Sequence, residues 1–187
     1  MTRFMLCVLA VLCAPLAFAQ SLTPAQMAGV RSAACADTNT ARPMMLAGDA
    51  NALIGWLNAD STFVVWRTRL TRDEATGDGF DWAQADNLTT GQARIWEWLF
   101  DNDRRATNPS SASVRAGISE AWKGTAAKLA VATFVLAASK RPANNIERAL
   151  ATGTGTTATP GLLTFEGRAA TATPIVYRDD GSLWGCP

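Results

Sequence analysis

The amino-acid sequence predicts a mainly α fold: a small helical bundle with a short extended segment and a C-terminal β-hairpin. Three observations predict this class. Capping boxes, in which a threonine is followed three residues later by Gln or Glu, begin at Thr23, Thr71 and Thr89. Apolar residues recur at helical spacing in several segments. Hydrophobic residues make up 48% of the 187 residues, which is enough for one well-buried core.

The N-terminal third is expected to contain two helices and then the extended segment. Thr23 begins a helix that runs to about Ala36, and Asp49 caps a shorter helix that ends in the turn at 58–61. Residues 63–68 are mostly β-branched or aromatic and contain no signal for the start or end of a helix, so they are expected to be extended.

Residues 88–100 form the helix around which the bundle is expected to assemble. Behind the Thr89 capping box, Trp96, Trp98 and Phe100 follow within five residues. Aromatic side chains of this size bury about 150–250 Å² each. The helix therefore needs neighbours on more than one side, either within the bundle or from another subunit. The preceding loop is expected to be pinned to the core by Phe80 and Trp82.

Three more helices are expected towards the C-terminus. The first is capped by Ser113 and carries one apolar stripe that includes Trp122. Residues 125–139 are apolar almost all round, which predicts a fully buried helix that is too short for a membrane span. The last is amphipathic, over about 146–150, and Gly153 ends it.

The domain organisation follows from these elements. Residues 20–151 form one helical domain, 152–160 form a linker rich in Thr, Gly and Ala, and 161–187 form an extended tail or hairpin. The hairpin is predicted because the Asp-Gly pair at 180–181 separates two short apolar runs.

The N-terminus has the form of a secretory signal peptide. Arg3 is followed by an apolar run over 4–12 and by Ala17-Phe18-Ala19, a small-x-small cleavage site, so residues 1–19 are signal-peptide-like. An alternative is that Met1 is not the true start of translation. After cleavage no membrane association is expected.

Cleavage would leave two cysteines, Cys35 and Cys186. In an oxidising compartment they would form one disulfide that ties the ends together and stabilises the fold by about 4–5 kcal/mol. The other interpretation is two free thiols, and the sequence does not favour either.

Charge and composition restrict the function. With 17 basic and 16 acidic residues, the chain has no net field to attract nucleic acid. Histidine, the commonest general base and metal ligand, is absent. We therefore expect no enzymatic activity, no metal and no cofactor. Any catalysis would need carboxylates, Tyr177, a lysine or a thiol.

Two groups of acidic residues suggest functional sites, and each also has a simpler structural explanation. Asp86, Asp101 and Asp103 would supply oxygen ligands to a hard cation, but the spacing of a calcium loop is missing, and a polar helix end explains them. Glu97, between two tryptophans, would be an acid with a raised pKa, but a position at the solvent edge or a pairing with Arg94 or Arg104 is the simpler interpretation.

Two anion-binding patterns are also weak. The Thr-Gly-Thr-Gly run at 152–155 resembles a phosphate loop only superficially, because a helix ends there instead of beginning. Arg67, Arg69 and Arg72 lie close to Trp66 in the sequence and would suit a nucleic acid, but the acidic residues that follow at once neutralise them.

The chain contains the segments Val65-Trp66-Arg67-Thr68, Gly79-Phe80-Asp81-Trp82, Gly91-Gln92-Ala93-Arg94-Ile95-Trp96-Glu97-Trp98, Trp122-Lys123-Gly124-Thr125, Ala151-Thr152-Gly153-Thr154-Gly155-Thr156 and Phe165-Glu166-Gly167. Together these segments resemble a family of small proteins encoded in the structural gene blocks of tailed bacteriophages and prophages. The resemblance spans residues 57–167. Residues 1–19 and the end after Gly167 depart from the family pattern.

The resemblance implies a non-enzymatic structural or assembly protein of a tailed phage virion, in the head-tail region or tail, assembled in the host cytoplasm. Its partners would be copies of itself or other virion proteins. The alternative is a periplasmic or secreted helical binding module with one disulfide. Aromatic residues and arginine dominate interface cores, so the expected interface residues are Trp66, Arg67, Arg94, Trp96, Trp98, Phe100 and Trp122.

Overall fold

The fold was obtained as a computed structural model, which describes residues 22–101 and 105–186. The signal-peptide-like segment 1–19, Asp103 and Arg104, the last named as a partner for Glu97, lie outside the described residues. The described chain is mainly helical, with two small antiparallel sheets of two strands each. Among these residues, no helix is both long and apolar enough to cross a bilayer.

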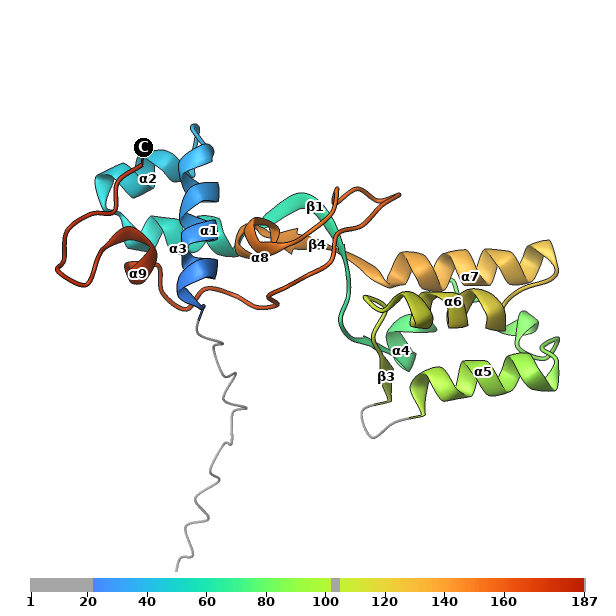
Figure 1. The fold of residues 1–187 in the computed structure, drawn as a ribbon. Helices are drawn as coiled ribbons and strands as arrows, with labels where there is room; N and C mark the ends of the chain where they lie inside the picture. The colour runs from blue at the N-terminus through green and yellow to red at the C-terminus, as the bar shows by residue number, and fades with distance from the viewer. Residues whose placement is uncertain (1–21, 102–104, 187) are drawn as a thin grey trace, which may run out of the picture.

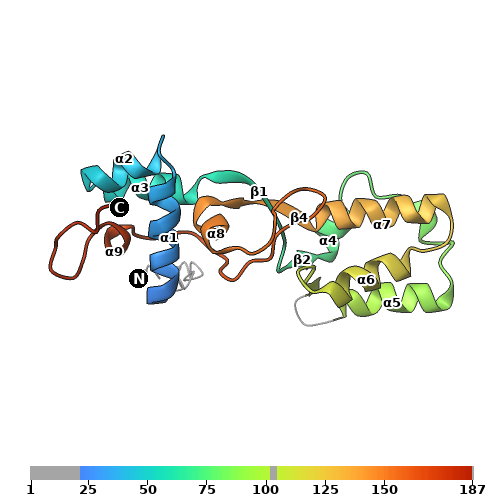
Figure 2. The ribbon, with the colours of Figure 1, turned by 45° about the horizontal axis from the view of Figure 1, so that its top comes forward.

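The elements form two lobes along an elongated molecule (Figures 1 and 2). The first lobe, residues 22–66 and 140–186, contains α1 (Pro24–Ala36), α2 (Ala41–Ala47), α3 (Ala50–Asn58), β1 (Asp60–Trp66), β4 (Lys140–Asn144), α8 (Asn145–Leu150) and α9 (Thr173–Val176). The second lobe, residues 67–139, contains β2 (Leu70–Thr71), α4 (Arg72–Ala75), the 3-10 helix η1 (Trp82–Gln84), α5 (Thr90–Phe100), β3 (Ala106–Thr107), α6 (Ala112–Ala121) and α7 (Ala126–Ala138).

Each lobe has its own hydrophobic core, where the composition had suggested a single one. In the first lobe, Val30, Met45 and Leu53 from the N-terminal helices meet Ile146 and Ile175 from the C-terminal part of the chain. In the second lobe, the core is built around the aromatic side chains of Phe80, Trp96, Phe100 and Trp122. The second lobe is therefore an insertion between the two halves of the first.

The predicted helix starts are confirmed where a capping box marked them. Thr23, Thr71 and Thr89 each accept a hydrogen bond from the backbone N–H three residues on, and the box is complete in all three. Asp49 caps α3 as expected. A further box, Asn144 with Glu147, begins α8.

The extended segment predicted near residue 63 is β1, and its partner strand is β4. The register pairs Val64 with Pro142 and Trp66 with Lys140. Strand β4 contains Pro142, which an edge strand of a two-stranded sheet tolerates because proline donates no ladder bond.

The segment expected as a linker lies along the other edge of β1. Val64 N–H donates to the Gly155 carbonyl at 2.7 Å, and Gly161 N–H donates to the Val64 carbonyl at 2.8 Å. An added Cβ at Gly155 or Gly161 would collide with the Phe63 ring. The strand is thus hydrogen-bonded on both edges.

The tail continues the first core instead of standing apart from it. Phe165, Ile175 and Val176 are buried there, and residues 173–176 are helical. The expected hairpin is reduced to one antiparallel bridge between Tyr177 and Leu183, with Gly181 at φ 80° in the turn.

The prediction of a fully buried helix at 125–139 is wrong. Helix α7 buries Val131, Ala132 and Val135, but Leu129 is 50% exposed. Its one lysine, Lys128, is buried and donates to the Asn87 carbonyl at 2.6 Å. Apolar composition therefore did not distinguish a core helix from one that covers a single side of a small lobe.

Candidate interaction surface

The seven residues expected at an interface separate into three groups. The first group, Trp96, Phe100 and Trp122, is at most 6% exposed in the second core. The Trp96 and Trp122 rings pack edge to face at 5.3 Å, and Trp96 and Phe100 at 5.0 Å. These three side chains hold α5 and α6 together within one chain, so they offer no free surface.

The second group, Trp66 and Arg67, lies at the junction of the lobes. The half-buried Trp66 ring lies under the Arg115 guanidinium at 4.7 Å and the Lys140 ammonium at 5.1 Å. Arg67 pairs with Glu74 at 2.8 Å. The hydrogen bond from Thr71 N–H, with help from the Arg67 charge, lowers the pKa of Glu74. This group connects β1 to α4 and α6.

The third group, Arg94 and Trp98, is exposed on α5. Trp98 is 65% exposed, and the Arg94 guanidinium lies 5.9 Å from its ring centroid. Of the two aromatics expected to pin the preceding loop to the core, Phe80 is buried at 7% exposure, whereas Trp82 packs edge to face on Phe80 and is 59% exposed. Two indoles of the second lobe therefore face solvent.

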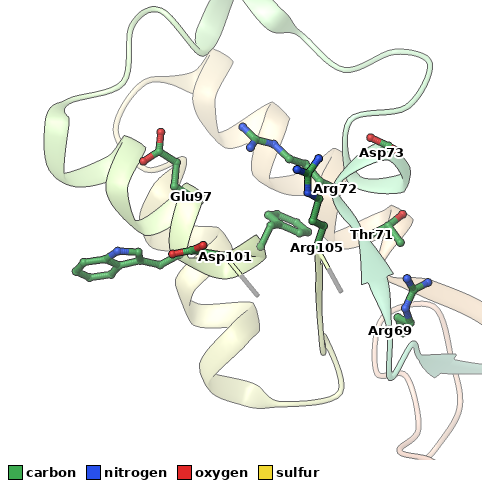
Figure 3. Close-up of a pocket in the computed structure, with 9 residues that line it drawn as sticks. Arg69, Thr71, Arg72, Asp73, Glu97, Asp101 and Arg105 are labelled. Carbon is green, nitrogen blue, oxygen red and sulfur yellow. The ribbon is translucent and has the colours of Figure 1, made fainter. Parts of the chain in front are cut away.

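A cleft of about 780 Å³ lies beside Trp98 (Figure 3). Phe100 and Trp98 of α5 line it together with Thr71 and six charged residues: Arg69, Arg72, Asp73, Glu97, Asp101 and Arg105. Arg69 and Arg72, which the sequence had grouped with Trp66, thus share a cleft with Trp98 instead. Arg105 gave no signal in the sequence.

The pairing of β2 with β3 brings Arg72 and Arg105 together. The register joins Leu70 to Thr107 and Thr71 to Ala106, so the next opposed pair is Arg72 and Arg105. Arg72 N–H donates to the Arg105 carbonyl at 3.2 Å, which continues this register by one residue. Arg105 has φ 45°, an uncommon value for a residue other than glycine.

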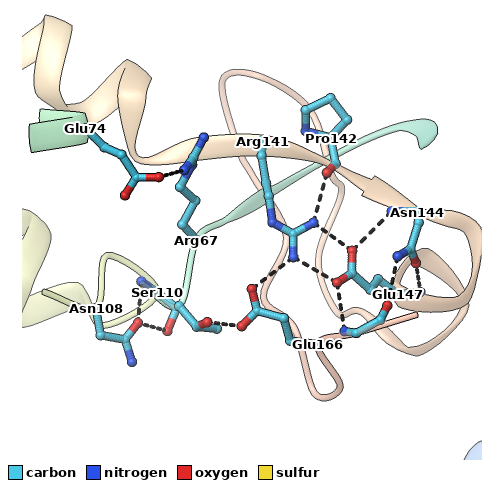
Figure 4. A network of polar contacts seen from close by, with 11 residues as sticks. Arg67, Glu74, Asn108, Ser110, Arg141, Pro142, Asn144, Glu147 and Glu166 are labelled. Carbon is cyan, nitrogen blue, oxygen red and sulfur yellow. Dashed lines mark hydrogen bonds and ion pairs between the residues drawn. The ribbon is translucent and has the colours of Figure 1, made fainter. Parts of the chain in front are cut away.

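A charged network closes the junction on the first-lobe side (Figure 4). Arg141 forms two hydrogen bonds to Glu147, at 2.7 and 2.8 Å, and one to Glu166 at 3.1 Å. Thr68 donates to Glu166. Burial alone would raise the pKa of Glu147, but the Arg141 hydrogen bonds and the N–H groups of Asn144 and Gly167 outweigh it and lower that pKa. The same hydrogen bonds raise the pKa of Arg141.

Cys35 and Cys186 form a disulfide with their Cα atoms 5.4 Å apart. Next to the bridge, the Trp184 ring lies 3.8 Å from the Arg31 guanidinium and 4.9 Å from that of Arg178. The bridge therefore fixes the C-terminal segment to α1.

The described residues contain no group of three or more His, Cys, Asp or Glu side chains placed to hold a metal ion. Of the acidic residues weighed as cation ligands, Asp101 lines the cleft and Asp86 does not. Comparison with protein-family models, with curated proteins and with solved structures finds no match to this chain.

Proposed function

We propose that this chain is a non-enzymatic structural or assembly protein of a tailed phage virion, and that it works by packing against copies of itself or other virion proteins. The observation that carries the proposal is the exposure of Trp98 on α5, beside Arg94. Burial of an indole at an interface is strongly favourable, and Trp and Arg are enriched among residues that dominate binding energy. The sequence resemblance over 57–167 supplies the virion context.

The test is the protein composition of purified particles from a host that carries the gene. We expect the chain in particles at a fixed stoichiometry, and we expect Trp98→Ala to reduce that amount while the purified variant stays folded. Lys123→Ala, a surface change on the same lobe, is the matched control. Particles that form normally without the chain would refute the proposal.

The Cys35–Cys186 bridge favours a second candidate, an exported helical binding module, since disulfides persist in oxidising compartments. Intact mass of the protein from fractionated cells separates the two candidates. Loss of residues 1–19 together with two missing hydrogens, in a periplasmic or secreted fraction, supports export. A full-length chain in the cytoplasmic and particle fractions supports the virion.

A further inference from the structure

Arg72 and Arg105, which oppose each other where β2 pairs with β3, indicate what kind of ligand binds the cleft. Like charges directly opposite each other on paired strands destabilise the pairing. Nevertheless none of Arg69, Arg72 and Arg105 has a carboxylate of the described residues within ion-pair distance; the ion pairs of this part of the chain involve Arg67, Lys123 and Arg141. Three exposed guanidinium groups therefore line one cleft with no ion pair to a described residue, although Asp73, Glu97 and Asp101 line the same cleft.

The backbone at Arg105 supports the same interpretation. A non-glycine residue at φ 45° has an unfavourable backbone conformation, which is kept where the surrounding structure or a function requires it. Here it holds an arginine opposite another arginine. The opposed arginines and the positive φ of Arg105 are both unfavourable for folding. Together they favour binding of an anion between the two guanidinium groups, since arginine pairs with carboxylate through two parallel hydrogen bonds.

The acidic residues of the cleft restrict the kind of anion. Figure 3 shows Glu97 on α5 and Asp101 directly after it, while Asp73 lies on α4 next to Arg72 and the arginines come from the segments flanking β2 and β3. A nucleic acid would bring closely spaced phosphates against these carboxylates. A single carboxylate side chain would bring only one negative charge to the arginines, and an apolar neighbour in the same segment would meet the Trp98 ring.

We propose that this cleft binds a carboxylate-bearing segment of a partner protein, with an acidic side chain between Arg72 and Arg105 and an apolar one against Trp98. The inference rests on the proposed assembly function and names the chemistry of the partner.

Binding of three labelled probes to the full-length protein, followed by fluorescence anisotropy at fixed ionic strength, tests it. The probes are a blocked hexapeptide of alternating leucine and glutamate, its glutamine counterpart, and an oligothymidylate. We expect saturable binding of the glutamate peptide, at least about tenfold weaker binding of the glutamine peptide, and a similar loss in Arg72→Gln/Arg105→Gln. Arg148→Gln, which removes an exposed arginine of the first lobe, should bind like the wild type.

A second variant separates binding from folding. Arg105→Gly removes the guanidinium and suits the positive φ, so it should weaken peptide binding without lowering the melting temperature. Equal affinity for the glutamate and glutamine peptides, wild-type affinity in the double variant, or tighter binding of the oligothymidylate would each overturn the inference. Absence of peptide binding by a chain that is present in particles would overturn this inference alone, whereas arginine-dependent binding by a chain absent from particles would overturn only the virion proposal.

Discussion

Trp96 and Trp98 show how two nearby side chains of one helix take different roles. Two positions along a helix correspond to a rotation of about 200°, so the two indoles point to opposite sides. The structure buries Trp96 to 6% exposure and leaves Trp98 at 65%. The sequence could predict the helix and its cap, but it could not assign these faces because apolar residues surround most of it.

Alanine substitutions should reproduce this difference in stability. Trp96→Ala removes a side chain that packs against Trp122 and Phe100, so it should lower the free energy of unfolding by about 3–5 kcal/mol. Trp98→Ala should change it by about 0.5 kcal/mol or less. Urea denaturation of both variants measures this. Equal destabilisation would mean that α5 is rotated relative to the present structure.

Glu147 is the buried charge on which the junction depends. Its side chain is 2% exposed and accepts hydrogen bonds from Arg141, Asn144 and Gly167. Glu147→Gln leaves the Arg141 charge without its main partner and should reduce the free energy of unfolding by about 3 kcal/mol. Glu166→Gln, whose side chain is 43% exposed, should cost less than about 1 kcal/mol. A larger loss in Glu166→Gln than in Glu147→Gln would contradict this ranking.

The lowered pKa of Glu147 also predicts a pH dependence. Because its pKa is lower folded than unfolded, the stabilisation is fully present above the unfolded value of about 4.3 and is lost as pH falls through the folded value. The difference in unfolding free energy between wild type and Glu147→Gln should therefore shrink below about pH 4.3. A difference that stays constant from neutral to acid pH would exclude the carboxylate as its source.

Complete capping boxes were reliable signals, whereas the Ser113 cap and the hairpin signal at 180–181 were not: α6 begins after Ser111, and the hairpin is a single bridge. Capping boxes at Thr23, Thr71 and Thr89 marked helix starts because both partners lie within one turn. β4 contains a proline and charged residues, so no period indicated a strand, and only its pairing with β1 makes it one. The cleft was missed for the same reason, since Arg72 and Arg105 meet only through the β2–β3 register.

The loop at 152–161 offers a test of how much β1 depends on it. Gly155 and Gly181 both have positive φ, at 66° and 80°, but only Gly155 lies against the Phe63 ring, whereas a Cβ at Gly181 meets nothing within 4 Å. Alanine should cost about 1–2 kcal/mol at either site for the backbone and a further 1–3 kcal/mol or so at Gly155 for overpacking. Thermal denaturation of both variants measures the difference, and equal losses would place the loop away from β1.

The two hydrophobic cores, and the order in which the chain visits the two lobes, determine how the protein should unfold. The second lobe is contiguous, whereas the first is assembled from two segments separated by 73 residues, 67–139. Composition predicted enough apolar surface for a core but could not show that it divides between two sites. That division depends on β1 and β4 meeting, which is a contact between distant parts of the sequence.

The disulfide should therefore stabilise the lobes unequally. Cys35 and Cys186 both belong to the first lobe, at a sequence separation of 151. Cys35→Ser/Cys186→Ser frees its two halves in the unfolded chain and should cost that lobe about 5 kcal/mol by loop-closure entropy. The second lobe is held together by its own core, so the temperature of its unfolding transition should not change. Calorimetry of the oxidised and double-serine proteins, with near-UV circular dichroism to follow the buried tryptophans Trp96 and Trp122, should show one transition falling and the other fixed. If both fall by the same amount, the lobes unfold as one cooperative unit, and the β1–β4 junction couples them more strongly than their separate cores imply.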